Sequence, residues 1–279
     1  MPELPEVETV RRGLEPRIVG RTLRDADIRD GRLTAPDDPR EVGIELDGER
    51  FAGVGRRGKY LLFRFDTGRT LVVHLRMTGW FHHRPPGASD PEPTHIRAVF
   101  HLDDGATLLY CDQRRFGTMR LIEPGELDAY LRPRAGPEPL SPEWSPRRLR
   151  ADLAGRRAPV KALLLHQGIV AGVGNIYADE ALWQARIHPL RTGGSLTAAE
   201  VRRLYAAVVE SLERGIDSRG ASIRDYRDVD GERGGMQERF AAYARTGEPC
   251  PRCGTPIEKI RVAQRGTHLC PRCTRPRFV

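Results

Sequence analysis

The sequence predicts an α+β protein of several domains: an N-terminal antiparallel β-sandwich with terminal helices, a helical domain and a small C-terminal ribbon. Three observations support this prediction. Short alternating runs separated by glycine turns fill residues 20–122, which is typical of a sandwich or barrel. Helical hydrophobic spacing follows from about residue 147, and two Cys-x-x-Cys pairs lie near the C-terminus. The expected domains are residues 1–133, 147–245 and 246–279, with residues 134–146 as a proline-rich linker.

The first expected element is an amphipathic helix over residues 1–16. Val7, Val10 and Leu14 follow Pro5 at helical spacing. Proline is tolerated in the first turn of a helix, where its missing N–H would have no partner, and the acidic residues around it suit the positive end of the helix dipole. The helix is therefore expected to begin almost at the first residue.

The later elements are predicted from turn and capping signals. Strands bounded by D-G and T-G turns are expected at residues 59–65, 70–75 and 97–102. In the helical domain, Thr197 and Glu200 have the spacing of a capping box at the start of a long amphipathic helix. Residues 215–235 contain five glycines and many charges, so we expect a mobile loop there.

The composition favours a polyanionic partner such as nucleic acid. The net charge is +8 and the pI is near 9.6, although an arginine-favouring genome would give the same excess. Only three lysines stand among the basic residues, and they are candidates for chemistry: Lys59, Lys161 and Lys259. No apolar run is long enough to span a membrane, and the acidic start of the chain lacks the features of a secretory signal, so we expect a cytoplasmic protein.

Four cysteines near the C-terminus have the spacing of a metal site. The pairs Cys250/Cys253 and Cys270/Cys273 are separated by 16 residues and predict one tetrahedral Zn²⁺ site. Four protein thiolates leave no open position for water, so the metal is expected to be structural. A β-hairpin with Arg265 near its tip is expected between the pairs, where the arginine is either a phosphate ligand or simply solvated. The fifth cysteine, Cys111, is expected to be a core thiol.

Two further segments carry possible chemistry. The run Ala171-Gly-Val-Gly-Asn175 joins two helical stretches, so its glycines allow a phosphate to approach a helix N-terminus, with Asn175 as an added donor. A tight helical turn explains this run equally well. Removal of Met1 would give Pro2 a secondary amine that can attack an aldehyde-like carbon, with Glu3 as a neighbouring acid. For this segment taken alone, simple helix punctuation is the other interpretation.

Two strand ends carry residues suited to unstacking a base. Met77 lies in a polar turn, and Arg114 and Phe116 follow a strand. An apolar wedge combined with an arginine is what a protein needs to replace an everted base in a duplex. The alternative is that Met77 and Phe116 pack in the core.

Together these residues resemble the formamidopyrimidine-DNA glycosylase family, the bifunctional repair enzymes that excise oxidised purines. The resemblance covers nearly the whole chain. Its motifs are P-E-L-P-E-V-E-T, R-R-G-K-Y-L-L, H-L-R-M-T-G, R-R-F-G-T-M, G-P-E-P-L-S, V-K-A-L-L-L, G-V-G-N-I-Y-A-D-E-A-L and the cysteine ribbon with Q-R-G-T. The resemblance implies a β-sandwich, a helical domain with a helix–two-turns–helix motif, and damaged double-stranded DNA as the partner of a monomer that uses no small-molecule cofactor.

The resemblance also implies roles for individual residues. Pro2 would be the nucleophile, Glu3 the acid, Lys59 the acid in β-elimination, and Arg265 would act in δ-elimination and bind phosphate. Met77, Arg114 and Phe116 would fill the gap left by the everted base, with Arg114 reading the orphaned cytosine. The backbone of the DNA would be contacted by His95, Arg156, Lys161 and Asn175.

The sequence departs from the family pattern at four positions. Pro93 replaces the first histidine of an H-x-H pair, Gln113 replaces a proline, Ala221 lies in the lesion-facing loop, and Met236 stands where an aromatic residue is usual. None of them is the nucleophile, so they affect lesion preference before catalysis. Two alternatives stay open: an oxidised-pyrimidine glycosylase of the same superfamily, and a non-catalytic module that binds damaged DNA.

Overall fold

The computed structural model describes residues 1–89, 91–223 and 226–275. The chain divides into two compact units. The N-terminal unit comprises Met1–Arg132 and Ser218–Gly235, and the C-terminal unit comprises Pro133–Asp217 and Met236–Val279. The segment Ser218–Gly235, expected in the helical domain, instead belongs to the N-terminal unit.

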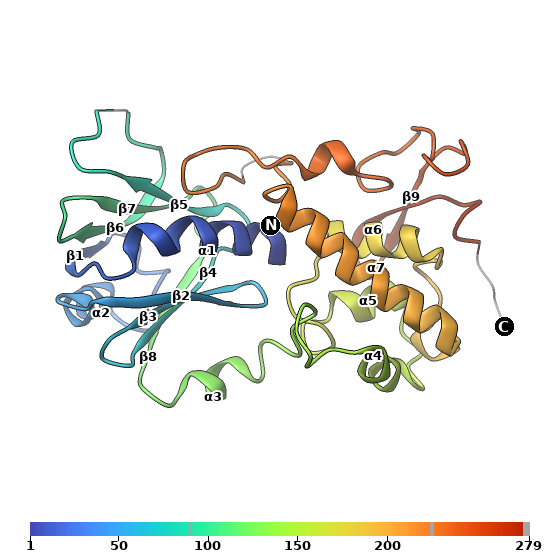
Figure 1. Ribbon diagram of the computed structural model, residues 1–279, viewed down its shortest axis with the longest axis horizontal. Helices are drawn as coiled ribbons and strands as arrows, with labels where there is room; N and C mark the ends of the chain where they lie inside the picture. Colours follow the sequence, from blue (N-terminus) through green and yellow to red (C-terminus); the bar gives the residue numbers. More distant parts are fainter. Residues whose placement is uncertain (90, 224–225, 276–279) are drawn as a thin grey trace. The chain divides into compact units, whose positions relative to one another are not determined.

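The N-terminal unit is a sandwich of two four-stranded antiparallel sheets, as predicted (Figure 1). The first sheet has the order β1 (Leu23–Ile28), β6 (Ile96–Leu102), β7 (Thr107–Asp112), β5 (Gly79–Arg84). The second has the order β2 (Phe51–Arg57), β3 (Tyr60–Phe65), β4 (Thr70–His74), β8 (Thr118–Ile122). Both sheets contribute to one apolar core, with Phe100 and Leu108 from the first sheet and Phe63 and Leu71 from the second.

Helix α1 (Leu4–Ile18) lies along one side of this sandwich (Figure 1). Its apolar stripe of Val7, Val10 and Leu14 is fully buried in the shared core, as the helical spacing predicts. The helix continues past Pro16 to Ile18, two residues beyond the expected end. This stripe ties the first residues of the chain firmly to the sandwich.

A second helix in this unit, α2 (Pro39–Leu46), lies within residues 20–122, for which short strands are predicted. The prediction is wrong for this segment. Asp38 caps it by accepting a hydrogen bond from the Arg40 backbone at 2.8 Å, and Pro39 occupies the first turn. The helix has only eight residues, too few for its spacing to stand out from the surrounding strands. The short helix α3 (Leu127–Leu131) ends the unit's first stretch.

The C-terminal unit is helical, as predicted. Its helices are α4 (Pro146–Leu153), α5 (Val160–Leu165), α6 (Asn175–Ala185) and α7 (Ala198–Asp217), with 3₁₀ turns η1 (Gly193–Ser195) and η2 (Met236–Arg239). The capping box before α7 is present, with Thr197 N–H donating to Glu200 at 2.8 Å. The expected linker is part of this unit, because Trp144 is buried against Tyr205. None of the helices in the described ranges is long and apolar enough to cross a membrane.

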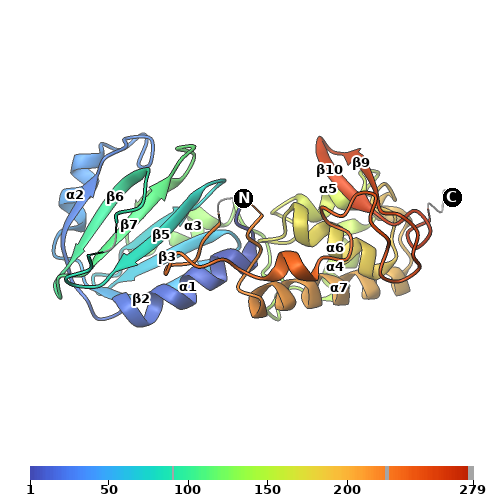
Figure 2. The ribbon, with the colours of Figure 1, turned by 90° about the horizontal axis from the view of Figure 1, so that it is seen from above.

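The predicted C-terminal hairpin consists of β9 (Glu258–Val262) and β10 (Arg265–Leu269). Figure 2 shows it beside α5 and α6. Val262 pairs with Arg265, so Ala263 and Gln264 form a two-residue turn and Arg265 stands next to the tip. The position expected for this arginine is confirmed.

Candidate active site and nucleic-acid-binding residues

The first turn of α1 is organised by two buried carboxylates. Pro2 and Glu3 are buried, and Glu3 caps the helix in a reciprocal capping box with Glu6. The Glu3 backbone N–H donates to Glu6 Oε2 at 2.8 Å. The other Glu6 oxygen accepts from the backbone N–H of Ala221 at 2.8 Å. Glu6 therefore connects the proposed nucleophile segment to the segment Ser218–Gly235, a role that sequence reasoning missed although Glu3-x-x-Glu6 has capping-box spacing.

The described part of Ser218–Gly235 is held to α1, which differs from the mobile loop expected there. Arg17 pairs with Asp230 at 2.8 Å, and the Tyr226 hydroxyl donates to the Glu6 carbonyl at 3.3 Å. Ser222 is 1% exposed and bonds to the Tyr226 carbonyl at 2.9 Å. The glycine and charge content predicted a mobile loop. The prediction is wrong here because the partners that hold the segment lie on α1, far away in the sequence.

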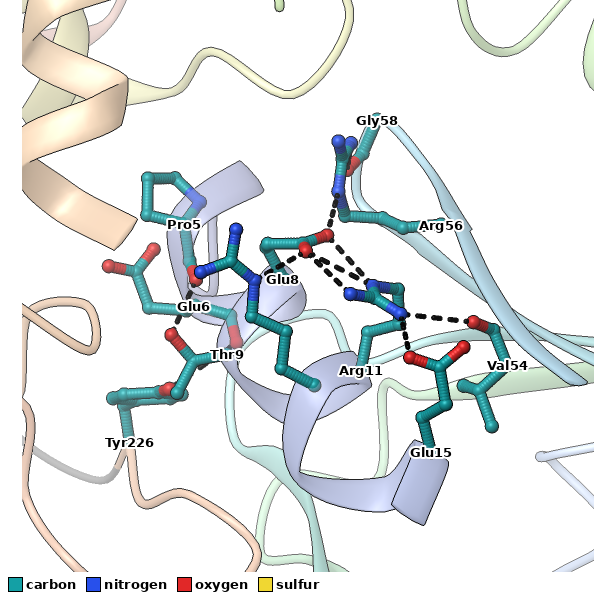
Figure 3. A network of polar contacts seen from close by, with 11 residues as sticks. Pro5, Glu6, Glu8, Thr9, Arg11, Glu15, Val54, Arg56, Gly58 and Tyr226 are labelled. Carbon is teal, nitrogen blue, oxygen red and sulfur yellow. Dashed lines mark hydrogen bonds and ion pairs between the residues drawn. The ribbon is translucent and has the colours of Figure 1, made fainter. Parts of the chain in front are cut away.

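A cluster around Glu8 ties α1 to β2 (Figure 3). Glu8 accepts hydrogen bonds from Arg11, Arg12 and, at 3.1 Å, from Arg56. Burial acts to raise the pKa of Glu8, but these arginines lower it overall. Arg56 also donates to the Gly58 carbonyl at 3.1 Å, so the cluster fixes the turn between β2 and β3 relative to the first turns of α1.

Lys59 lies in that turn. Gly58 has the left-handed φ of 55° that a two-residue hairpin turn needs at its first position, and Lys59 follows it at 6% exposed. The neighbouring His74, on β4, has its pKa lowered to about 3 by burial and by the charges of Arg76 and Lys59. His74 is therefore neutral, and its Nδ1 accepts the backbone N–H of Arg76 at 3.0 Å. This bond shapes the turn that carries Met77.

The three expected wedge residues lie on neighbouring loops of the N-terminal unit. Met77 is half-buried in the turn before β5, whereas Arg114 and Phe116 follow β7 and are exposed. The Phe116 ring is 51% exposed and lies 4.8 Å from the Arg114 guanidinium, so it is not a core residue. Nearby, the exposed His95 has a φ of 63°, and its carbonyl accepts a hydrogen bond from the Asp112 backbone N–H at 3.0 Å.

Cys111 is 1% exposed and is the predicted core thiol, with its pKa raised to about 12 by burial.

In the C-terminal unit, Asn175 and Lys161 meet at the backbone of the β9–β10 hairpin. Asn175 is the first residue of α6, and its side-chain amide donates to the Gly266 carbonyl at 3.0 Å. The Lys161 ammonium, on α5, donates to the same carbonyl at 3.1 Å and to the Thr267 hydroxyl at 2.7 Å. Both side chains therefore orient the strand that begins with Arg265, which is exposed like Arg156 after α4.

Lys161, which the resemblance assigns to the DNA backbone, is buried in this structure. Its side chain has no exposed surface, and its ammonium forms an ion pair with Asp179 at 2.6 Å. The second Asp179 oxygen accepts the His268 backbone N–H at 2.9 Å. In this structure the buried, paired ammonium holds α5, α6 and β10 together, and contact between Lys161 and the DNA backbone stays a prediction. Sequence reasoning missed Asp179 because nothing in the local pattern pairs it with a lysine 18 positions away.

The four cysteines form the predicted structural zinc site. Their Sγ atoms all lie within 4.8 Å of one another, with 3.5 Å between Cys253 and Cys270 and 3.9 Å between Cys250 and Cys273. Tetrahedral Zn–S bonds of ~2.3 Å require sulfur–sulfur distances of about 3.8 Å, which these spacings match. Trp183 on α6 donates its indole N–H to Cys250 at 3.4 Å, so the site is bonded to the helical core.

Comparison with known proteins identifies matches along nearly the entire chain. Residues 1–119 match the formamidopyrimidine-DNA glycosylase N-terminal domain, residues 135–227 match the H2TH domain of the same enzymes, and residues 247–275 match the zinc finger found in FPG and IleRS. Formamidopyrimidine-DNA glycosylase from Symbiobacterium thermophilum is 52% identical over 98% of this chain and 89% of its own length. The Chloroflexus aurantiacus protein of the same name is 46% identical over 98% and 97%.

Solved structures give the same result. A Lactococcus lactis Fpg in complex with DNA containing an abasic site is 38% identical, with a TM-score of 0.91 over 98% of this chain and 100% of that chain. MutM in complex with DNA containing carbocyclic 8-oxo-G has the same identity and TM-score, over 99% and 100%. With its sandwich, H2TH helices and four-cysteine zinc site, the chain belongs to the formamidopyrimidine-DNA glycosylase family.

Proposed function

We propose that this chain is a bifunctional DNA glycosylase and abasic-site lyase of base excision repair that removes oxidised purines such as 8-oxoguanine and formamidopyrimidines. Similar proteins were solved with DNA containing Fapy-dG, an abasic site or an 8-oxo-G analogue. The observation that best supports the proposal is the pair of hydrogen bonds that the Glu6 carboxylate accepts from the backbone N–H groups of Glu3 and Ala221, which joins the segment of the proposed nucleophile to the lesion-facing loop. We propose damaged duplex DNA as partner, a monomer, no small-molecule cofactor and a cytoplasmic location.

In the first chemical step, the amine of Pro2 displaces the damaged base from C1′ of the sugar. Removal of Met1 gives Pro2 a secondary amine, of which an appreciable fraction is neutral at pH 7 because α-amino groups titrate near pH ~7.7–8.0. Its lone pair forms a bond to C1′ of the damaged nucleotide, and the electron pair of the glycosidic bond leaves with the base. The proton of the attacking amine passes to the departing base, so the nitrogen regains a lone pair that can expel the ring oxygen O4′. Glu3, buried beside Pro2, supplies the proton that opens the sugar ring and leaves a cationic iminium.

Strand cleavage follows from the iminium without activation of water. The cation acidifies the C2′ proton, and the electrons released by its loss expel the 3′ phosphate; loss of the C4′ proton then expels the 5′ phosphate. We assign Lys59 to the first elimination and Arg265 to the second, where it also binds phosphate. The zinc ion has four thiolate ligands and no open position, so it supports the hairpin that carries Arg265.

Recognition of the duplex is assigned to exposed and half-buried residues of both units. Met77, Arg114 and Phe116 replace the everted base, which offsets part of the few kcal/mol that unstacking costs, and Arg114 reads the opposite cytosine. His95, Arg156 and Asn175 contact the DNA backbone. Lys161 supports this set from the buried pair with Asp179.

The deciding experiment is borohydride trapping of untagged protein on a duplex carrying 8-oxoguanine opposite cytosine, followed by mass spectrometry of the adduct. We expect a covalent adduct on Pro2. No adduct on this duplex or on a plain abasic site would favour the non-catalytic module. Excision of thymine glycol in preference to 8-oxoguanine, in matched duplexes, would favour the pyrimidine enzyme.

Two variants separate the chemical roles. Pro2→Gly should abolish or alter the imine chemistry, and unchanged cleavage by this variant would contradict the proposed nucleophile. Lys59→Arg keeps the positive charge but transfers a proton poorly, so strand scission should slow while base release persists. Equal elimination rates would remove the role of Lys59.

A further inference from the structure

The two loops that carry the proposed wedge share one buried carboxylate. Asp112, the last residue of β7, has no exposed surface. Its Oδ1 accepts a hydrogen bond from the Thr78 hydroxyl at 2.5 Å and from the Arg114 backbone N–H at 3.2 Å. Its Oδ2 accepts the Gly117 backbone N–H at 2.8 Å. The carboxylate thus holds the residue after Met77 and both ends of the loop that bears Arg114 and Phe116.

The loops are also fixed to each other and to the core beneath them. The Thr78 hydroxyl oxygen itself accepts the Arg114 N–H at 3.0 Å, which closes a small ring of hydrogen bonds with Asp112. A Cβ at Gly79 would lie 2.2 Å from the Tyr110 hydroxyl oxygen, and a Cβ at Gly117 would lie 1.8 Å from it. Both loops therefore pack directly against the hydroxyl end of the Tyr110 side chain. Each loop therefore has little room to shift without the other.

Arg115, between the two wedge residues, has a different partner. Its φ is 58°, and its guanidinium pairs with Asp30 at 2.5 Å. The left-handed residue and its ion pair leave Arg114 and Phe116 as the exposed, mutually contacting side chains of the loop. Four hydrogen bonds and the Arg115–Asp30 ion pair therefore fix the two loops that carry the three wedge side chains.

We propose that Asp112 is a positioning residue that holds Met77, Arg114 and Phe116 as one preorganised wedge, and that it thereby determines how strongly the enzyme discriminates the base opposite the lesion. This inference rests on the proposed function. A wedge that is ordered before DNA binds loses less conformational entropy when the base is everted. A fixed guanidinium at Arg114 also distinguishes hydrogen-bonding partners more sharply than a mobile one.

The charge state and shape of the carboxylate matter for this role. A carboxylate offers acceptor sites only, and here it meets three donors. In Asp112→Asn an NH₂ group replaces one oxygen, so one loop loses its acceptor and faces a donor instead. The side-chain volume stays the same, which separates loop positioning from core packing.

The test compares Asp112→Asn with Asp128→Asn, an exposed aspartate on α3, on three substrates: 8-oxoguanine opposite cytosine, 8-oxoguanine opposite adenine, and a single-stranded abasic oligonucleotide. For Asp112→Asn we expect kcat/KM on the cytosine duplex to fall roughly tenfold to hundredfold, because a charge-assisted hydrogen bond is lost. The cytosine-to-adenine preference should shrink. Cleavage of the single strand, which needs no wedge, should stay within about twofold of wild type, since its chemistry is untouched. Asp128→Asn should match wild type throughout.

A second variant keeps the test independent of folding. Thr78→Val removes one hydroxyl from the ring, and it should weaken duplex excision in the same direction, with a double variant that is less than additive. The inference is overturned if Asp112→Asn excises from the cytosine duplex at the wild-type rate, or if cleavage of the single strand falls by the same factor. Failure of the wild-type protein itself to cleave abasic DNA would contradict the proposed function, which is a distinct outcome.

Discussion

Each unit presents a basic side chain at a two-residue hairpin turn, and the two hairpins are stabilised in different ways. The β2–β3 hairpin carries Lys59 on a foundation of buried apolar residues, including Phe51, Leu61 and Phe63. In the β9–β10 hairpin, which carries Arg265, the buried apolar side chains are Val262 and Leu269. The second hairpin is held by zinc and by the buried pair of Lys161 and Asp179.

This difference indicates what holds each of the two proposed catalytic side chains, Lys59 and Arg265, in position. Apolar burial is non-directional and holds the Lys59 turn as part of the sandwich core. Zinc and a buried charge pair are directional, but each fails as a whole when one partner is removed. The Arg265 hairpin should therefore respond steeply to single changes that the Lys59 hairpin tolerates.

The largest expected effect is loss of the metal. Chelation of zinc, or Cys253→Ser, should unfold the β9–β10 hairpin, since structural zinc contributes on the order of 10 kcal/mol to small domains. DNA affinity should be lost while the β-sheet circular dichroism of the sandwich persists. Metal analysis should find one zinc per chain in wild type. The control is Cys111→Ala, which changes a core thiol and should keep one zinc; a wild-type protein without zinc contradicts the site.

The next effect is expected at the buried ion pair. Lys161→Met leaves Asp179 as an uncompensated buried charge, so the free energy of unfolding should fall by about 3–5 kcal/mol. Chemical denaturation measures this loss. The matched control, Lys259→Met, changes an exposed lysine and should stay within about 0.5 kcal/mol of wild type. Adding Asp179→Asn to Lys161→Met should restore part of the stability; no recovery would show that charge is not the cause.

A smaller effect is expected from pH at the Lys59 side of the comparison. Burial, Arg76 and Lys59 lower the pKa of His74 to about 3. Below its ordinary pKa of about 6.5 the unfolded chain binds a proton that the folded chain does not, so stability falls as pH decreases from 6.5 toward 3. The loss should reach about 2 kcal/mol at pH 5, at ~1.4 kcal/mol per pH unit.

His74→Asn keeps a hydrogen-bond acceptor and removes the titration, so its stability should depend less on pH between 7 and 5. Burial also lowers the pKa of His83 and of His188, and their contributions cancel in the comparison with wild type. The exposed His101 supplies the control, as His101→Gln should keep the wild-type slope. Equal slopes for His74→Asn and wild type would refute the assignment.

The smallest effects concern the turns themselves. Gly58 occupies a left-handed position in one hairpin, whereas Ala263 and Gln264 adopt φ values of 47° and 62° in the other. Gly58→Ala should destabilise by about 1 kcal/mol, because non-glycine residues are strained in this region. Gln264→Gly should raise the free energy of unfolding by ~0.5 kcal/mol, because relief of the left-handed strain exceeds the extra conformational entropy that glycine gives the unfolded chain. Thermal unfolding should show Tm shifts of opposite sign; shifts of the same sign would contradict this account.

Much of the candidate site was predictable because its residues carry local signals. The Cys-x-x-Cys pairs, the hairpin bearing Arg265, the capped start of α7 and the buried stripe of α1 all follow from spacing within one element. The resemblance placed Pro2, Glu3 and Lys59 by their motifs, and their catalytic roles remain proposals. Helix α2 was missed because eight residues with one capping aspartate give a weak periodic signal.

Spacing and motifs along the chain were enough to assign the zinc ligands and the family. Only the tertiary structure decided which buried polar groups meet: Thr78 with Asp112 across 34 positions, Lys161 with Thr267 across 106, and Glu6 with Ala221 across 215. The physical reason is that hydrophobic period and turn propensity act over a few residues, whereas a buried carboxylate or ammonium takes whatever partner the packed elements bring to it.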